Sequence, residues 1–241
     1  AIDLGASTVS GTYAVTATAG GDITDSGVLA ITSGATFTVA GGRNITLDQS
    51  STFSSTVTFA SSGTIASVEI NDSNAFDLKT LTTTGNLTVT AGGNITDSGT
   101  VTVGGNLAAT TDANNGVIDL GTLAVDGTMA LATHGTGAAT VVNDAGLNFA
   151  ASTVGGALSA TATTGNVAQS GALAITGVTT IAADSGNNIT LNNTSNNFQA
   201  AVRITSGNNV TLVDAGAIDL GASTVSGTYA VTATAGGDIT D

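Results

Sequence analysis

The chain has 241 residues, and its 17 Asp and Glu residues against three Lys and Arg give a formal net charge of −14 at pH 7. Nucleic acids and anionic membranes bind clustered basic residues, so the composition argues against both as partners. The absence of Cys excludes disulfides and thiolate metal sites, and no apolar run is long enough for membrane insertion as a helix.

Short strands are predicted from the first residues onward, as triplets in which two apolar residues flank a polar or small one. Ile2-Asp3-Leu4 is the first, and Leu29-Ala30-Ile31, Phe37-Thr38-Val39 and Ile45-Thr46-Leu47 follow. Alternation with period two places the outer residues of a triplet on one face and the middle residue on the other. The Gly, Asn, Ser and Asp residues between triplets tolerate tightly turned backbone.

One eight-residue phrase, TAGGDITD, occupies residues 18–25 and recurs at 234–241, with a near copy, TAGGNITD, at 90–97. We interpret the phrase as a repeated corner in which the two glycines turn the chain, Asp22 caps the turn and Ile23 points inward. The predicted corner residues are Gly20, Gly21, Gly92 and Gly93.

Longer repeats enclose these corners. Residues 1–25 recur without change at 217–241, which predicts a 216-residue tandem unit at 1–216 and a next unit that starts at 217. We therefore expect a natural protein that is longer at both ends. Within the unit, similar segments begin at Ile2, Phe76 and Leu147, and they divide it into blocks 1–75, 76–146 and 147–216.

The repeats predict an all-β fold, a parallel β-helix or β-solenoid, as one continuous domain over residues 1–241. Three segments of about 24 residues in each block would form triangular coils, about ten in the chain, around a common apolar core. The predicted core residues share the inward positions of the triplets: Ile2, Leu4, Ile23, Leu29, Ile31, Phe37, Val39, Ile45, Leu47, Phe76, Leu78, Ile95, Leu147, Phe149, Ile189 and Leu191.

Residues 85–107, GNLTVTAGGNITDSGTVTVGGNL, and their cousins GTYAVTATAGGDITDSG and GALSATATTGNVAQSG resemble the repeat regions of filamentous-haemagglutinin-like exoproteins, the large adhesins of bacterial two-partner secretion. The resemblance covers essentially the whole chain. It implies a right-handed β-helix shaft that is secreted to the bacterial cell surface with the help of an outer-membrane secretion partner. The secretion domain and any receptor-binding region of that family have no counterpart in this sequence.

Carboxylates at the corners raise the question of calcium, because hard cations take carboxylate and carbonyl oxygens at turns. The calcium candidates are Asp22, Asp25 and Asp97. Their spacing does not match the nonapeptide repeat that binds calcium in other solenoids, so Asx turns are the favoured interpretation. We expect no cofactor, with calcium between neighbouring coils or filaments as the alternative.

Catalysis is not expected, and no residue is assigned a catalytic role. The single His134 lies in a Gly-rich turn sequence, and the cations Lys79, Arg43 and Arg203 fall in different segments, whereas a polysaccharide lyase needs a base and cations together. Thr-x-Thr triplets such as Thr16-Ala17-Thr18 are found in ice-binding solenoids, but here they do not recur on consecutive coils.

The sequence therefore predicts a structural shaft of a giant extracellular protein or filament, with a role in adhesion, at the cell surface or as a biofilm scaffold. The chain would associate with itself, end to end as continuous repeats and laterally as filaments. The alternative is a binding module, an adhesin flank that recognises glycan or a neighbouring filament, with ice binding as a further alternative.

Overall fold

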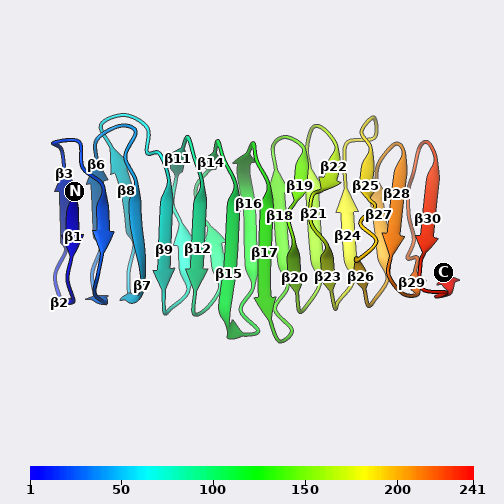
Figure 1. Ribbon diagram of the computed structural model, residues 1–241, viewed down its shortest axis with the longest axis horizontal. Helices are drawn as coiled ribbons and strands as arrows, with labels where there is room; N and C mark the ends of the chain where they lie inside the picture. The colour runs from blue at the N-terminus through cyan, green and yellow to red at the C-terminus, as the bar shows by residue number, and fades with distance from the viewer.

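The structure is a computed structural model that describes the backbone of residues 1–241 and all side chains except those of Ala113 and Asn114. In these residues the fold is all-β without a helix, a β-solenoid of parallel strands with about 11 turns that lie about 21 residues apart (Figure 1). The two ends of the chain lie at opposite ends of the stack. The predicted β-solenoid is confirmed. The predicted coil length of about 24 residues is larger than the observed spacing, and the predicted number of about ten coils is slightly smaller than the observed number of turns.

Two kinds of segment make up the turns. A bent segment holds two short stretches of strand on either side of a corner, and a straight segment is one strand, usually of five residues. The two stretches of a bent segment and the facing straight strand supply the three strands of the predicted triangular coil, and the straight strand is usually the longest of the three. In β7 and β16 both stretches of the bent segment belong to one long strand, because β7 pairs with both β4 and β5, and β16 pairs with both β13 and β14.

In the first block the bent segments are β1 (Ile2–Leu4) with β2 (Ser7–Val9), β4 (Ile23–Asp25) with β5 (Leu29–Ile31), and β7 (Ile45–Phe53). The straight segments are β3 (Tyr13–Ala17), β6 (Ala35–Val39), β8 (Val57–Ser61) and β9 (Val68–Asp72). In the second block the bent segments are β10 (Phe76–Leu78) with β11 (Leu81–Thr83), β13 (Ile95–Asp97) with β14 (Val101–Val103), and β16 (Ile118–Val125). The straight segments are β12 (Leu87–Ala91), β15 (Leu107–Asn114), β17 (Met129–His134) and β18 (Ala139–Asn143).

In the third block the bent segments are β19 (Leu147–Phe149) with β20 (Ser152–Val154), β22 (Val167–Gln169) with β23 (Leu173–Ile175), and β25 (Ile189–Leu191) with β26 (Asn197–Phe198). The straight segments are β21 (Leu158–Ala162), β24 (Thr179–Ala182), β27 (Val202–Ser206) and β28 (Val210–Asp214). The last strands are β29 (Ile218–Asp219), β30 (Tyr229–Ala233) and β31 (Ile239–Thr240).

Successive segments alternate between two walls of the solenoid. The long wall is the 17-stranded sheet that contains β1, β12 and β30. The split wall consists of the three-stranded sheet β3-β6-β8, followed by the nine-stranded sheet that contains β10 and β27. Apolar residues stack on apolar residues from turn to turn, as in the series Ile2, Ile23, Ile45 and Val68 of the long wall.

Each block contains seven segments, three bent and four straight, and therefore makes three and a half turns rather than the three that the repeats suggested. Because seven is odd, equivalent segments of consecutive blocks lie on opposite walls. Tyr13 pairs with Ala35 in the split wall, whereas Tyr229, in the identical copy of that sequence, pairs with Val210 in the long wall. The two identical 25-residue copies therefore place the same strand in opposite walls of the solenoid.

The predicted core is buried with one exception. Ile2 is only partly buried, because β1 has a ladder neighbour, β4, on one side only. The predicted corners lie between strands, with Gly20 at a φ of +80°, a backbone conformation that favours glycine. A Cβ on Gly92 would collide with the backbone oxygen of Ser73 in the preceding turn, so this corner needs glycine for close stacking.

The outward positions keep acidic side chains apart. Asp3 stacks on Thr24 and Glu69 stacks on Thr46, while Thr96 separates Asp77 from Asp119 in the split wall. Like charges that face each other directly across a ladder repel, so interposed Thr lets an acidic surface stack.

Candidate functional site: the junctions between blocks

Side chains at the corners tie each turn to the next. Oδ1 of Asp22 accepts a hydrogen bond from the backbone N–H of Asn44 at 3.0 Å, and Oδ1 of Asn44 accepts one from Ser67 N–H at 3.1 Å. Asn166, Asn188 and their successors continue this arrangement in the third block. These corner side chains satisfy backbone N–H groups that the ladder leaves free at each bend.

The other two calcium candidates also accept hydrogen bonds from the following turn. Oδ1 of Asp25 accepts from the N–H groups of Asp48, at 2.9 Å, and Gln49. The two carboxylate oxygens of Asp97 accept from the N–H groups of Gly121, at 2.9 Å, and Thr122, at 2.8 Å. The structure therefore gives these three carboxylates backbone donors as partners.

Asp25 differs from Asp97 in its burial. It points inward at the end of β4 with 7% of its surface exposed, and its Oδ2 is buried without a hydrogen-bond partner. Burial raises the pKa of Asp25 to about 6, the nearby charge of Asp48 acts in the same direction, and the two backbone hydrogen bonds oppose the rise. The folded chain therefore binds a proton at this carboxyl more tightly than the unfolded chain does.

Each block ends on two consecutive straight strands, and the second of them ends on a buried polar residue. These residues are Asp72 in β9, Asn143 in β18 and Asp214 in β28. Each of these side chains accepts a hydrogen bond from a backbone N–H of the bent segment in the preceding turn. The donors are Phe53 at 3.2 Å, Val125 at 2.8 Å and Phe198 at 2.7 Å. A straight strand cannot follow both stretches of a bent one, so the inward side chain replaces the missing backbone partner.

At the same block boundary, a bent segment must stack on a straight strand in the opposite wall. Between the second and third blocks, Ala150 N–H donates to the oxygen of Met129 at 2.8 Å, and Leu131 N–H donates to Oγ of Ser152 at 3.1 Å. After the third block the equivalent bonds run from Gly221 N–H to Val202 and from Ile204 N–H to Ser223. Their lengths are 2.9 and 3.1 Å. We call these two places the closed junctions.

The boundary between the first and second blocks lacks these bonds. In the described part of the chain, no strand pairing or backbone hydrogen bond joins β8 to β10 or β11. Leu81 stands where Ser152 and Ser223 stand in the closed junctions, and Lys79 stands at the position of Ala150 and Gly221. A leucine has no hydroxyl to accept the N–H of the straight strand, so we call this boundary the open junction.

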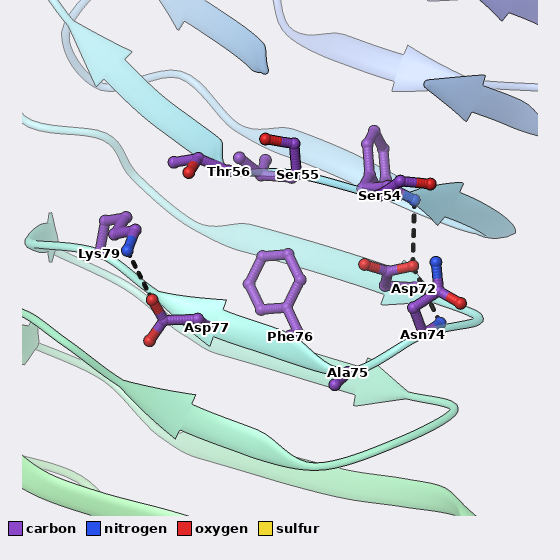
Figure 2. A pocket seen from close by; sticks show the side chains of 11 residues that line it. Ser54, Ser55, Thr56, Asp72, Asn74, Ala75, Phe76, Asp77 and Lys79 are labelled. Atoms are coloured by element: carbon purple, nitrogen blue, oxygen red, sulfur yellow. Dashed lines mark hydrogen bonds and ion pairs between the residues drawn. The ribbon is translucent and has the colours of Figure 1, made fainter. Parts of the chain in front are cut away.

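A cavity of about 400 Å³ lies in the open junction, between Ser54–Thr56 on one side and Asn74–Lys79 on the other (Figure 2). Lys79 Nζ lies 2.6 Å from a carboxylate oxygen of Asp77 at its rim. Although partial burial acts to raise the pKa of Asp77, hydrogen bonds from Lys79, Ser98 and Thr96 hold it below its usual value. Burial raises the pKa of Asp72, which also lines the cavity, against its two backbone hydrogen bonds.

A family model described as repeats of unknown function (DUF5649) matches residues 1–60, 66–126, 136–205 and 207–241. The chain belongs to the DUF5649 repeat family. Comparison with curated proteins and with solved structures gave no match. The β-solenoid is thus the architecture of a DUF5649 repeat array.

In this DUF5649 chain the single histidine and the basic residues lie apart from one another. His134 is exposed at the end of β17, where its Nδ1 contacts the backbone oxygen of Thr111, and Arg43 is exposed at a corner. Arg203 lies on β27, far along the stack from both the Lys79–Asp77 pair and Arg43. The described side chains contain no group of three or more His, Cys, Asp or Glu that could hold a metal ion, and no described helix could span a membrane.

Sequence reasoning missed the buried junction residues and the open junction. The signal was present, because VEIND, ATVVN and VTLVD end on Asp72, Asn143 and Asp214 at intervals of about 71 residues. The replacement of Ser by Leu81 was equally visible in the alignment of the blocks. Neither could be interpreted before the walls were known, because the repeat period alone does not separate three turns from three and a half.

Proposed function

We propose that the chain is a section of a structural shaft in a large bacterial surface protein or extracellular filament. The observation that carries the proposal is the continuity of the stack. A common core and the paired long wall run through about 11 turns, and the half-turn at each block boundary is accommodated without a linker. Each turn contacts only its neighbours, so the length of such a rod scales with the number of turns.

We propose further that the rod is extracellular, without catalysis, and that it reaches the cell surface through an outer-membrane secretion partner. The support for this is the sequence resemblance to filamentous-haemagglutinin-like exoproteins, together with the acidic, Cys-free composition. In the same proposal, Asp22, Asp25 and Asp97 cap turns through backbone donors, and self-association of the repeats supplies the partner.

The shaft is tested with chains that contain one, two and three copies of residues 1–216, examined by electron microscopy. A unit of about ten turns at about 4.8 Å spacing should add about 50 Å of straight rod per copy. When the chains are displayed on bacteria with a terminal tag, the tag should stand further from the membrane by the same increment. Globules joined by flexible links would contradict the proposal, as would a tag distance that does not depend on copy number.

A second candidate function, binding along the flank of the rod, is favoured by one observation. The open junction interrupts an otherwise paired wall and contains a cavity of about 400 Å³. The closed junctions repeat the same boundary with hydrogen bonds across it. The two proposals are compatible, because a binding site in one wall leaves the long wall continuous.

A further inference from the structure

One edge of the open junction is the free side of β8. Residues in a parallel strand direct their N–H and C=O groups alternately to the two sides. Ala35 N–H donates to the oxygen of Thr56, and Ser62 N–H donates to that of Val39, so the even-numbered residues of this strand face β6. Val57, Phe59 and Ser61 therefore direct their backbone groups into the open junction.

The other edge is the free side of β10. Phe76 N–H donates to the oxygen of Asn94 and Ser98 N–H donates to that of Leu78, so Phe76 and Leu78 face the following turn. By the same alternation Asp77, and Lys79 beyond it, direct their backbone groups toward β8. Two rows of backbone donors and acceptors without a strand partner thus face each other across the open junction.

We call the space between these edges of β8 and β10 the slot. It is elongated and closed at both ends. At one end Ile65 pairs with Thr83, and at the other Ser73 N–H donates to the oxygen of Ser51 at 2.7 Å. Between them lie the cavity of about 400 Å³ and a second of about 180 Å³, lined by Phe59, Ser61 and Leu81 among others. The five residues of β8 span about 17 Å at about 3.3 Å per residue, the length of an ordinary strand.

The chemistry of the slot fits a peptide backbone better than a sugar. Sugars bind proteins largely by stacking on an exposed aromatic face, but Phe76 and Phe53 are each only 3% exposed, and the partly buried Phe59 already stacks on Phe37. The alternating donors and acceptors of Val57, Phe59 and Asp77 match those of an extended chain. Because Lys79 neutralises Asp77 at the rim, the slot does not demand a charged ligand.

We propose that the open junction is a strand-addition site that binds an extended, uncharged peptide segment between β8 and β10. The bound segment runs parallel to both strands and completes the split wall, with apolar side chains toward the core and polar ones toward solvent. The proposal rests on the flank-binding function and not on the shaft. Main-chain hydrogen bonds provide most of the affinity, so the sequence requirement is loose.

The test uses a synthetic peptide with the sequence of residues 35–39, ATFTV, with both termini blocked, because this segment already pairs with the opposite side of β8 and matches the five-residue length of the slot. Amide hydrogen exchange of the whole chain is measured with and without the peptide. We expect exchange at Val57, Phe59 and Asp77 to slow by about tenfold or more, because these amides join a ladder. The amides of Thr58 and Ala60, which already face β6, should not change.

The matched control is the double variant Lys79→Gly with Leu81→Ser, which introduces the residues found at the closed junction of Gly221 and Ser223. This variant should protect Phe59 without peptide and should lose peptide binding. Leu81→Thr alone, which supplies a hydroxyl acceptor and keeps a methyl group, serves the same purpose if the double variant does not fold. A peptide N-methylated at alternate residues should not bind, because its donors toward one edge are blocked.

Three outcomes would overturn the proposal. The amides of Val57, Phe59 and Asp77 could already exchange slowly in the free chain, which would mean that the slot is closed. The neutral oligosaccharide maltohexaose could protect them where the peptide does not, which would leave flank binding intact and change the ligand class. Finally, neither probe could bind, which would remove flank binding at this site together with strand addition.

Discussion

The boundary after the first block and the boundary after the second stack the same kinds of segment but differ in the hydrogen bonds between them. In both, a bent segment of one block stacks on a straight strand of the block before. Ser152 and Ala150 bond to the preceding turn in the second boundary, whereas Leu81 and Lys79 leave one side of β8 unpaired in the first. Two side-chain positions therefore decide whether a wall of the solenoid is continuous.

The opposite wall shows no such difference. Asp72 in the first block and Asn143 in the second bond to the preceding bent segment in the same way. The half-turn is thus secured on one wall by a buried polar side chain and left variable on the other. This division allows a rod to stay straight and still carry a gap in one face.

The largest expected effect comes from removing the buried link of the second boundary. Asn143 is fully buried, bonds to Val125 through both its oxygen and its nitrogen, and donates to the oxygen of Gly146 at 2.7 Å. Asn143→Leu leaves these backbone groups without partners and should lower the free energy of unfolding by about 4 kcal/mol. Urea denaturation measures the loss, and the outward-facing control Thr140→Ala should stay within about 0.5 kcal/mol of the parent.

The next effect is a pH dependence of stability that arises at one of three equivalent corners. Asp25, Asp97 and Gln169 occupy the same position, and burial raises the pKa of Asp25 from 3.8 to about 6. Between about pH 4 and pH 6 the folded chain holds a proton that the unfolded chain releases, so stability falls as pH rises, by at most about 3 kcal/mol.

Asp25→Asn should remove that part of the fall and should therefore gain most over the parent at pH 7. The measurement is the difference between the unfolding free energies of variant and parent at pH 4 and pH 7. A difference that does not change with pH would show that the carboxyl is ionised throughout this range. Asp97→Asn is the matched control at the more exposed corner.

A smaller effect is expected from substitutions of the residues that close or open a boundary. Ser152→Ala removes the acceptor of the Leu131 N–H and should cost about 1.5 kcal/mol. Leu81 at the open junction is buried, so Leu81→Ser and Leu81→Ala should both destabilise by about 2 kcal/mol or more, but Leu81→Ser adds a partner for the Phe59 N–H and should lose about 1 kcal/mol less than Leu81→Ala. Melting temperatures of the three variants measure these differences. If Leu81→Ser destabilises as much as Leu81→Ala does, the serine is not what closes a boundary.

The smallest expected effect concerns the charge pair at the rim. Lys79 and Asp77 are both partly exposed, so their ion pair contributes about 0.5 kcal/mol, and salt screens it. Lys79→Ala should therefore change stability little, and the change should shrink further at 1 M salt. A loss above about 2 kcal/mol that persists in salt would mean that Lys79 supports the open junction through packing.

Much of the fold could be predicted, because the triplets carry local information. Alternation assigned Phe37, Ile45 and Leu147 to the interior correctly, since an apolar residue in a short strand has only one face to choose. The calcium candidates could be located but not their partners, because Asp25 and Asp97 bond to residues more than twenty positions away. The open junction depends on the absence of a partner for Phe59, which is a property of the stacked turns.

The sequence by itself determined which residues face inward, where the corners lie and that short strands stack in parallel, because these follow from side-chain chemistry over a few residues. Only the tertiary structure decided the turn length, the three and a half turns of a block and the wall that each copy occupies. The physical reason is that a turn closes on the residue that pairs with it, and Tyr13 and Tyr229 share one local sequence but have different neighbours. The wall on which a repeat lies is therefore set by the number of segments before it.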